Sequence, residues 1–156
     1  MSEKLLSVSD LSIGIDGKQL VNGVSFAIRK QQTLGVVGES GSGKSLTALS
    51  LIGLLPMGSI VTGSICLDSK EIANGSQKLM RSIRGKRIAM IFQEPMSSLN
   101  PVLTVGHQLT ETLLSHEPLS KKSAKAQSIE GLKAVGIEAE NFDSYPHECS
   151  GGMQQR

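Results

Sequence analysis

Short apolar stretches separated by turn residues predict an antiparallel β layer at the start of the chain. These stretches are residues 5–8, 11–15 and 24–28. Asp16-Gly17 and Asn22-Gly23 lie between them and predict turns, because Gly, Asn and Asp tolerate the backbone angles that tight turns need. Residues 33–37 form a nearly continuous apolar run, which is typical of a buried strand. We therefore expect an antiparallel layer that leads into one buried strand.

Apolar residues recur at helical spacing after this run and stop at Pro56. They are Leu46, Leu49, Ile52 and Leu55. Because proline cannot continue a helix, the pattern predicts a helix that ends before Pro56. Gly58 and Gly63 are expected to flank a loop. The next elements expected are a half-exposed strand at 64–68, a short polar helix at 76–84 and a buried strand at 87–92.

The pattern becomes entirely helical from residue 104 onward. Three apolar residues repeat at i, i+4 and i+8, and they are Val105, Leu109 and Leu113. A second helix is expected to begin after Ser120 as its N-cap and to end at Gly136. The chain is therefore predicted to have a mixed α/β part, residues 1–92, and a helical part, residues 93–156.

Composition narrows the possible function classes. The 156 residues suffice for one ordinary domain, and 16 basic residues nearly balance 14 acidic ones. With no basic stripe and only one Tyr and three Phe, nucleic-acid binding is not expected. No segment approaches the ~20 apolar residues of a membrane span, which favours the cytosol. Cys66 and Cys149 lie far apart in the sequence, so we expect two reduced thiols.

Residues 38–45 carry the main candidate chemistry. They read Gly-Glu-Ser-Gly-Ser-Gly-Lys-Ser and match G-x-x-x-x-G-K-[ST], the phosphate-binding P-loop. Backbone N–H groups of the glycine loop would face phosphate oxygens, Lys44 would reach the β- and γ-phosphates, and Ser45 would ligate Mg²⁺. The predicted nucleotide-binding residues are Gly38, Glu39, Ser40, Gly41, Ser42, Gly43, Lys44, Ser45 and Thr47.

Two other interpretations of these glycines remain open. One is a glycine-rich turn with an incidental Lys-Ser pair. The other is a dinucleotide-binding loop, which is less favoured because Lys44 and Ser45 would have no role in it and the acidic residue expected ~20 positions later is not evident. The predicted order of strand, loop and helix favours the P-loop.

Three matches in the same order add a family resemblance. The P-loop is the first match. Residues 91–95 read Ile-Phe-Gln-Glu-Pro and look like a Q-loop, which is the second, and the segment that follows it, residues 97–101, reads Ser-Ser-Leu-Asn-Pro. Residues 149–156 read Cys-Ser-Gly-Gly-Met-Gln-Gln-Arg and resemble the ABC signature, with Cys149 where Leu is usual. Over essentially its whole length the chain resembles the ATP-binding subunits of ABC transporters, in the branch that imports dipeptides, oligopeptides or nickel.

This resemblance implies roles for residues outside the P-loop. Gln93 would be catalytic together with Lys44, and it would touch Mg²⁺ and the attacking water. Ser150, Gly151 and Gly152 would contact the γ-phosphate of an ATP held by the opposite subunit. The adenine usually stacks on an aromatic residue near the first strands, where this chain offers only Ile13 and Ile15.

The resemblance also implies a fold, partners and a location. The expected fold class is α/β, a P-loop NTPase of ABC type with an incomplete sheet, an antiparallel β layer and an α-helical subdomain. The expected partners are a second ATP-binding subunit, transmembrane permease subunits and, indirectly, an extracytoplasmic substrate-binding protein. The subunit would lie peripherally on the cytoplasmic side of the membrane.

In this family a Walker B Asp, a Glu and a His follow the signature helix. We therefore expect the isolated chain to be a fragment that hydrolyses ATP very slowly or not at all. Two alternatives are a non-hydrolysing nucleotide-binding or interaction fragment, and a soluble ABC ATPase outside transport.

Overall fold

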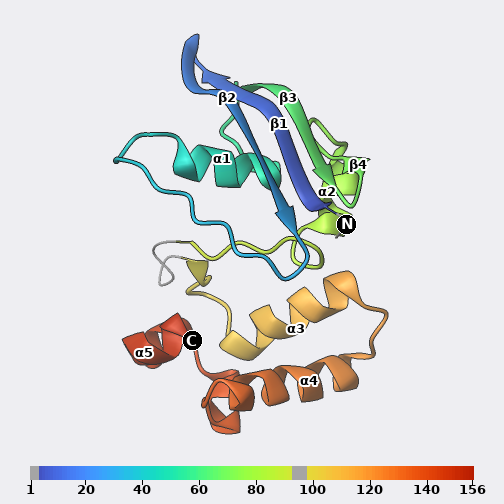
Figure 1. Cartoon of the computed structure of the whole chain (residues 1–156). Helices are drawn as coiled ribbons and strands as arrows, with labels where there is room; N and C mark the ends of the chain where they lie inside the picture. Colours follow the sequence, from blue (N-terminus) through green and yellow to red (C-terminus); the bar gives the residue numbers. More distant parts are fainter. Residues whose placement is uncertain (1–3, 93–97) are drawn as a thin grey trace. The chain divides into compact units, whose positions relative to one another are not determined.

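The structure, a computed structural model, describes residues 4–92 and 98–156. It divides the chain into two compact units, Met1–Ile88 and Ala89–Arg156. The first unit contains the β layer with two helices, and the second is helical (Figure 1). The division predicted from the sequence fell at residue 92.

An antiparallel sheet of four strands forms the first unit. The strand order is β2-β1-β3-β4, with β1 at Lys4–Ile15, β2 at Lys18–Arg29, β3 at Ile60–Leu67 and β4 at Lys70–Glu71. β1 pairs with both β2 and β3, and the three long strands lie side by side in Figure 1. Asp16 and Gly17 join β1 to β2 with φ angles of 49° and 76°. Positive φ at both central residues is the geometry of a two-residue hairpin turn, so the turn predicted there is confirmed.

Three details of the predicted β layer were wrong. β1 is one strand, although the sequence suggested separate strands at 5–8 and 11–15. The interruption is a bulge, because the β1 pairing shifts register around Asp10, which has a φ of 53°. Gly23 lies inside β2 and Gly63 lies inside β3, so neither marks a turn or a loop. A Cβ on Gly63 would lie 2.4 Å from the carbonyl oxygen of Asp10, which explains why glycine stands beside the bulge.

Two helices pack against the sheet in the first unit. They are α1, Lys44–Leu51, and α2, Gln77–Ile83. Leu46 and Leu51 of α1 and Met80 and Ile83 of α2 join the same apolar cluster as buried residues of β1 and β3. The helix predicted at 76–84 is confirmed, with the Ser76 hydroxyl accepting from the Leu79 N–H.

α1 ends earlier than its apolar pattern predicted. Gly53 follows the helix with a φ of 60°, and the N–H of Leu54 donates to the Leu49 carbonyl at 3.0 Å. This is a Schellman motif, in which a glycine closes the helix. Arg84 reinforces the end, because its Nε and Nη2 donate to the carbonyls of Ile52 and Gly53 at 2.6 and 2.7 Å.

The strands predicted at 33–37 and 87–92 are not present. Among the described residues, no strand pairs with either segment, apart from an isolated bridge between Arg84 and Ile88. Val37 is 94% exposed and Ile91 is 93% exposed. An apolar run becomes a strand only where a neighbouring backbone completes its hydrogen bonds, and the described residues supply none here.

The second unit contains the helices predicted after residue 104. They are α3 at Val105–His116, α4 at Lys121–Ala134 and α5 at Gly151–Gln155, with 3₁₀ turns η2 at Ala139–Asp143 and η3 at Pro146–Glu148. α3 and α4 run side by side in opposite directions (Figure 1). The predicted N-cap Ser120 is confirmed, since its hydroxyl accepts a backbone N–H. Thr104, where the helical pattern was predicted to begin, caps α3 in the same way.

The predicted stop at Gly136 is also confirmed. Gly136 has a φ of 71°, and its N–H and that of Ile137 close a second Schellman motif on the Lys133 and Leu132 carbonyls. Leu132 and Ile137 are buried together with Phe142 in the core of this unit.

Candidate nucleotide site

The P-loop follows the 33–37 segment and ends at α1. Gly41 and Gly43 have φ angles of 80° and 88°, a region that side-chain-bearing residues rarely adopt. A Cβ on Gly38 would lie 2.6 Å from the Ser42 Oγ. These glycines therefore permit a loop conformation that other residues would strain or block, while Glu39 and Ser40 are exposed.

The Lys44 ammonium lies against the backbone of the same loop. Its Nζ donates to the carbonyls of Gly38 and Glu39, both at 2.7 Å, and to the Ser42 hydroxyl at 3.3 Å. These contacts place a positive charge beside the loop that the sequence predicted would hold phosphates. An ammonium has three donors, so it can exchange these neutral acceptors for phosphate oxygens without leaving the loop.

The start of α1 adds positive potential at the same place. Gly43 is its N-cap, and a glycine has no side chain with which to cap the first N–H groups of the helix. The first N–H groups of a helix point outward with a partial positive charge, which suits an anion. Ser45 is exposed in the first turn, where its hydroxyl suits a hard cation such as Mg²⁺. The loop, Lys44 and Ser45 thus fit a nucleotide phosphate chain with its metal ion.

Thr47 lies differently from the other predicted nucleotide-binding residues. It is 8% exposed, and its hydroxyl donates to the Gly43 carbonyl at 3.0 Å. This hydrogen bond ties the helix to the last loop glycine. Direct contact of Thr47 with a nucleotide stays a prediction.

Strand β2 supports the loop through a contact that the sequence analysis missed. A Cβ on Gly43 would lie 2.7 Å from Cγ2 of Val21 and 3.1 Å from the Leu20 carbonyl oxygen. Val21 is 5% exposed and belongs to the core of the first unit. The separation of these residues in sequence left no local signal for the contact.

The two isoleucines considered for the adenine site have different environments. Ile13 is fully buried in the core, so it cannot contact a base, and this half of the expectation was wrong. Ile15 is half-buried at the end of β1 next to the hairpin turn.

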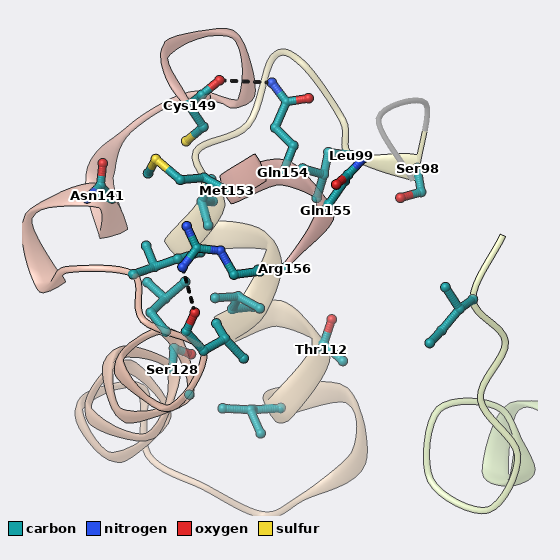
Figure 2. Close-up of a pocket in the computed structure, with 18 of the residues that line it drawn as sticks. Ser98, Leu99, Thr112, Ser128, Asn141, Cys149, Met153, Gln154, Gln155 and Arg156 are labelled. Atoms are coloured by element: carbon teal, nitrogen blue, oxygen red, sulfur yellow. Dashed lines mark hydrogen bonds between the residues drawn. The ribbon is translucent and has the colours of Figure 1, made fainter. Parts of the chain in front are cut away.

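The predicted signature residues begin α5. Ser150 is the N-cap, and its hydroxyl accepts from the Met153 N–H at 3.3 Å. Gly151 and Gly152 are exposed, and a Cβ on either would meet nothing within 4 Å. Side-chain hydrogen bonds from Gln154 and Arg156 join this helix to other segments of the second unit (Figure 2). The signature lies in the second unit and the P-loop in the first.

The region of the signature helix borders an apolar cavity in the second unit. The cavity has a volume of about 690 Å³ and is lined by α3 and α4 residues together with Cys149 and Met153 (Figure 2).

The predicted catalytic residue Gln93 lies outside the described residues. No cluster of His, Cys, Asp or Glu in the described ranges could hold a metal ion by itself. Nor do residues 4–92 and 98–156 contain a helix with the length and apolar character needed to span a membrane.

Comparison with curated proteins gives close relatives along nearly the whole chain. The oligopeptide transport ATP-binding protein OppD of Bacillus subtilis is 46% identical over 161 residues, which covers 98% of this chain and 45% of that protein. The dipeptide transport ATP-binding protein DppD of the same organism is 48% identical, with coverage of 99% and 48%. The chain spans about half the length of these curated relatives.

Solved structures show the same fold. CbiO1 of Clostridium perfringens, part of the ABC transporter complex cbiONQ, is 25% identical with a TM-score of 0.74, covering 98% of this chain and 58% of that one. The dimeric ABC transporter cassette MJ0796 is 22% identical with a TM-score of 0.78, with coverage of 96% and 65%. This likeness confirms the predicted fold class. The family model described as ABC transporter matches residues 21–156, and the chain therefore belongs to the ABC transporter family.

Proposed function

We propose that this chain forms the ATP-binding part of a subunit that powers the uptake of peptides, or of related solutes such as nickel, by an ABC importer. The observation that carries the proposal is the P-loop, where Lys44 Nζ, the glycines at positive φ and the open start of α1 meet. The identity of 46–48% to proteins named for oligopeptide and dipeptide transport supports the peptide cargo.

The residues of the first unit would bind and orient the nucleotide. Lys44 would exchange the carbonyls of Gly38 and Glu39 for phosphate oxygens, and the first N–H groups of α1 would add hydrogen bonds. A bound Mg²⁺ would neutralise the negative charge that develops on the phosphates. The Ser45 hydroxyl and, as the resemblance implies, Gln93 would hold it.

The second unit would act on a nucleotide held by another subunit. Ser150, Gly151 and Gly152 would approach the γ-phosphate closely, because neither glycine has a side chain to obstruct it. Closure around ATP would transmit force to permease subunits, with the ATP-binding part peripheral on the cytoplasmic side of the membrane. A substrate-binding protein outside the membrane would deliver the cargo.

Nucleotide binding is tested on the purified chain with a fluorescent ATP analogue and Mg²⁺. We expect saturable binding that Lys44→Ala weakens at least tenfold, since the variant loses the only side-chain cation that hydrogen-bonds the described loop residues. Lys122→Ala, in the exposed first turn of α4, is the matched control and should bind like the unmodified chain. Equal binding by the Lys44 variant and the control would refute the P-loop assignment.

The transport role is tested in the source cells by introducing Lys44→Ala into the encoded subunit. Uptake of a radiolabelled tripeptide should fall to background, while uptake of a free amino acid should not change. Unchanged peptide uptake would refute the cargo assignment, and uptake of nickel should then be measured in the same strain.

A further inference from the structure

Arg156 connects two helix ends in the second unit. Its Nη1 donates to the carbonyls of Val135 and Gly136, both at 3.0 Å, and its Nε donates to the Gly152 carbonyl at 3.2 Å. Val135 is the C-cap of α4, and Gly136 is the glycine that closes this helix. One guanidinium therefore contacts the end of α4 and the first turn of α5. Figure 2 draws Arg156 with one of these hydrogen bonds.

The chemistry of the contact suits arginine specifically. The last carbonyls of a helix have no partner within the helix and carry a partial negative charge. A guanidinium presents several N–H donors in a rigid plane, so it can bond two carbonyls of one helix and a third of another at the same time. A Cβ on Gly136 would lie 3.1 Å from Nη1, so the glycine that ends α4 also leaves room for this side chain.

Gln154 links α5 to the segment that precedes it in the chain. Its Nε2 donates to the Pro146 carbonyl at 2.6 Å and to the Cys149 carbonyl at 3.2 Å. These bonds tie α5 to η3, directly before the Ser150 cap. Gln154 thus fixes α5 to its own approach segment, whereas Arg156 fixes it to a helix that ends at residue 134.

We propose that Arg156 is the positioning residue of the signature segment: by joining the end of α4 to Gly152, it orients the start of α5. Its importance for ATP contact rests on the proposed function, but the link itself does not. Loss of Arg156 should leave the start of α5 free to open while the P-loop in the first unit is unaffected.

Amide hydrogen exchange measured by NMR on the chain tests the link. In Arg156→Ala, the amides of Gly136, Ile137 and Gln154, which are hydrogen-bonded in the structure, should exchange roughly 5- to 30-fold faster. Arg156→Lys should give an intermediate rate, because an ammonium keeps the charge but lacks the planar fork. Lys133→Ala, which removes a cation from the last turn of α4, is the matched control and should change little.

Two results would overturn the proposal. One is an Arg156→Ala rate equal to that of the Lys133 control, and the other is a lack of protection at Gln154 in the unmodified chain. Far-ultraviolet circular dichroism shows whether Arg156→Ala is folded. If it is unfolded, the exchange rates of Arg156→Lys, compared with those of the Lys133→Ala control, decide the role of Arg156.

A second measurement separates this inference from the proposed function. In the subunit that contains this chain, Arg156→Ala should lower ATP turnover at least tenfold while nucleotide affinity at the P-loop is unchanged, and Arg156→Lys should restore part of the turnover. If none of the variants binds nucleotide, the proposed function fails, whereas the exchange result still decides the role of Arg156.

Discussion

Replacing Gly43 with alanine tests whether β2 sets the shape of the P-loop. Gly43 has a φ of 88°, and a Cβ there would lie 2.7 Å from Cγ2 of Val21. Gly41 offers a matched control within the same loop, because its φ is 80° but a Cβ would meet nothing within 4 Å. The two substitutions therefore share the backbone strain, and only Gly43→Ala adds the collision.

The two contributions can be estimated separately. An alanine in the left-handed region costs about 1–2 kcal/mol, which is the expected loss of folding free energy for Gly41→Ala. Forcing a methyl group into a packed site costs about 1–3 kcal/mol more, so Gly43→Ala should lose about 2–5 kcal/mol. Combining it with Val21→Ala removes Cγ2, and the double variant should recover most of the collision term as a coupling free energy of about 1–3 kcal/mol.

Urea unfolding followed by circular dichroism measures these free energies for all variants. Equal losses for Gly41→Ala and Gly43→Ala, or additive losses in the Val21 double variant, would refute the argument that β2 supports the loop. Nucleotide binding is not the readout, since both glycines belong to the proposed site.

Two further substitutions test other parts of the first unit. Arg84→Ala should lower the free energy of unfolding by about 1–2 kcal/mol, because the carbonyls at the end of α1 lose a charged donor. Arg81 is exposed, so Arg81→Ala is the control and should have little effect. The urea midpoints of the two variants are compared. Burial opposes ionisation of Glu71, but hydrogen bonds led by that of the Ser64 hydroxyl together lower its pKa below the ordinary 4.5. Such a carboxylate stabilises the fold above its unfolded-state pKa, and this stabilisation is lost as the pH falls through the lower folded-state pKa. Glu71→Gln should therefore reduce stability at pH 7 and weaken its decline below about pH 5; an unchanged pH profile of the urea midpoint would contradict this.

Local signals predicted most helix ends correctly. Ser76, Thr104 and Ser120 are caps because a hydroxyl before a helix satisfies a free N–H, and this chemistry is contained within four residues. Gly136 ends α4 for a similarly local reason. At α1 the apolar spacing suggested a longer helix, and the glycine at residue 53 ended it.

In the candidate site too, local features could be predicted from the sequence and long-range contacts could not. The P-loop residues could be predicted because their chemistry lies in eight consecutive positions. The support of Gly43 by Val21 and the link from Arg156 to the end of α4 could not, since each joins residues about 20 positions apart. The sequence suggested that Ile13 could contact the adenine, but Ile13 is buried. Its burial depends on which segments pack against its strand, and these are distant in the sequence.

The sequence by itself determined the P-loop motif, the capped helices, the Asp16-Gly17 hairpin and the resemblance to the ABC transporter family. Each depends on residue types at short, fixed spacings. Tertiary structure alone decided that β1 is one bulged strand and that the apolar segments at 33–37 and 87–92 are not strands within the described residues. The physical reason is that a helix completes its hydrogen bonds within its own segment, whereas a strand requires a neighbouring backbone that its own residues do not specify.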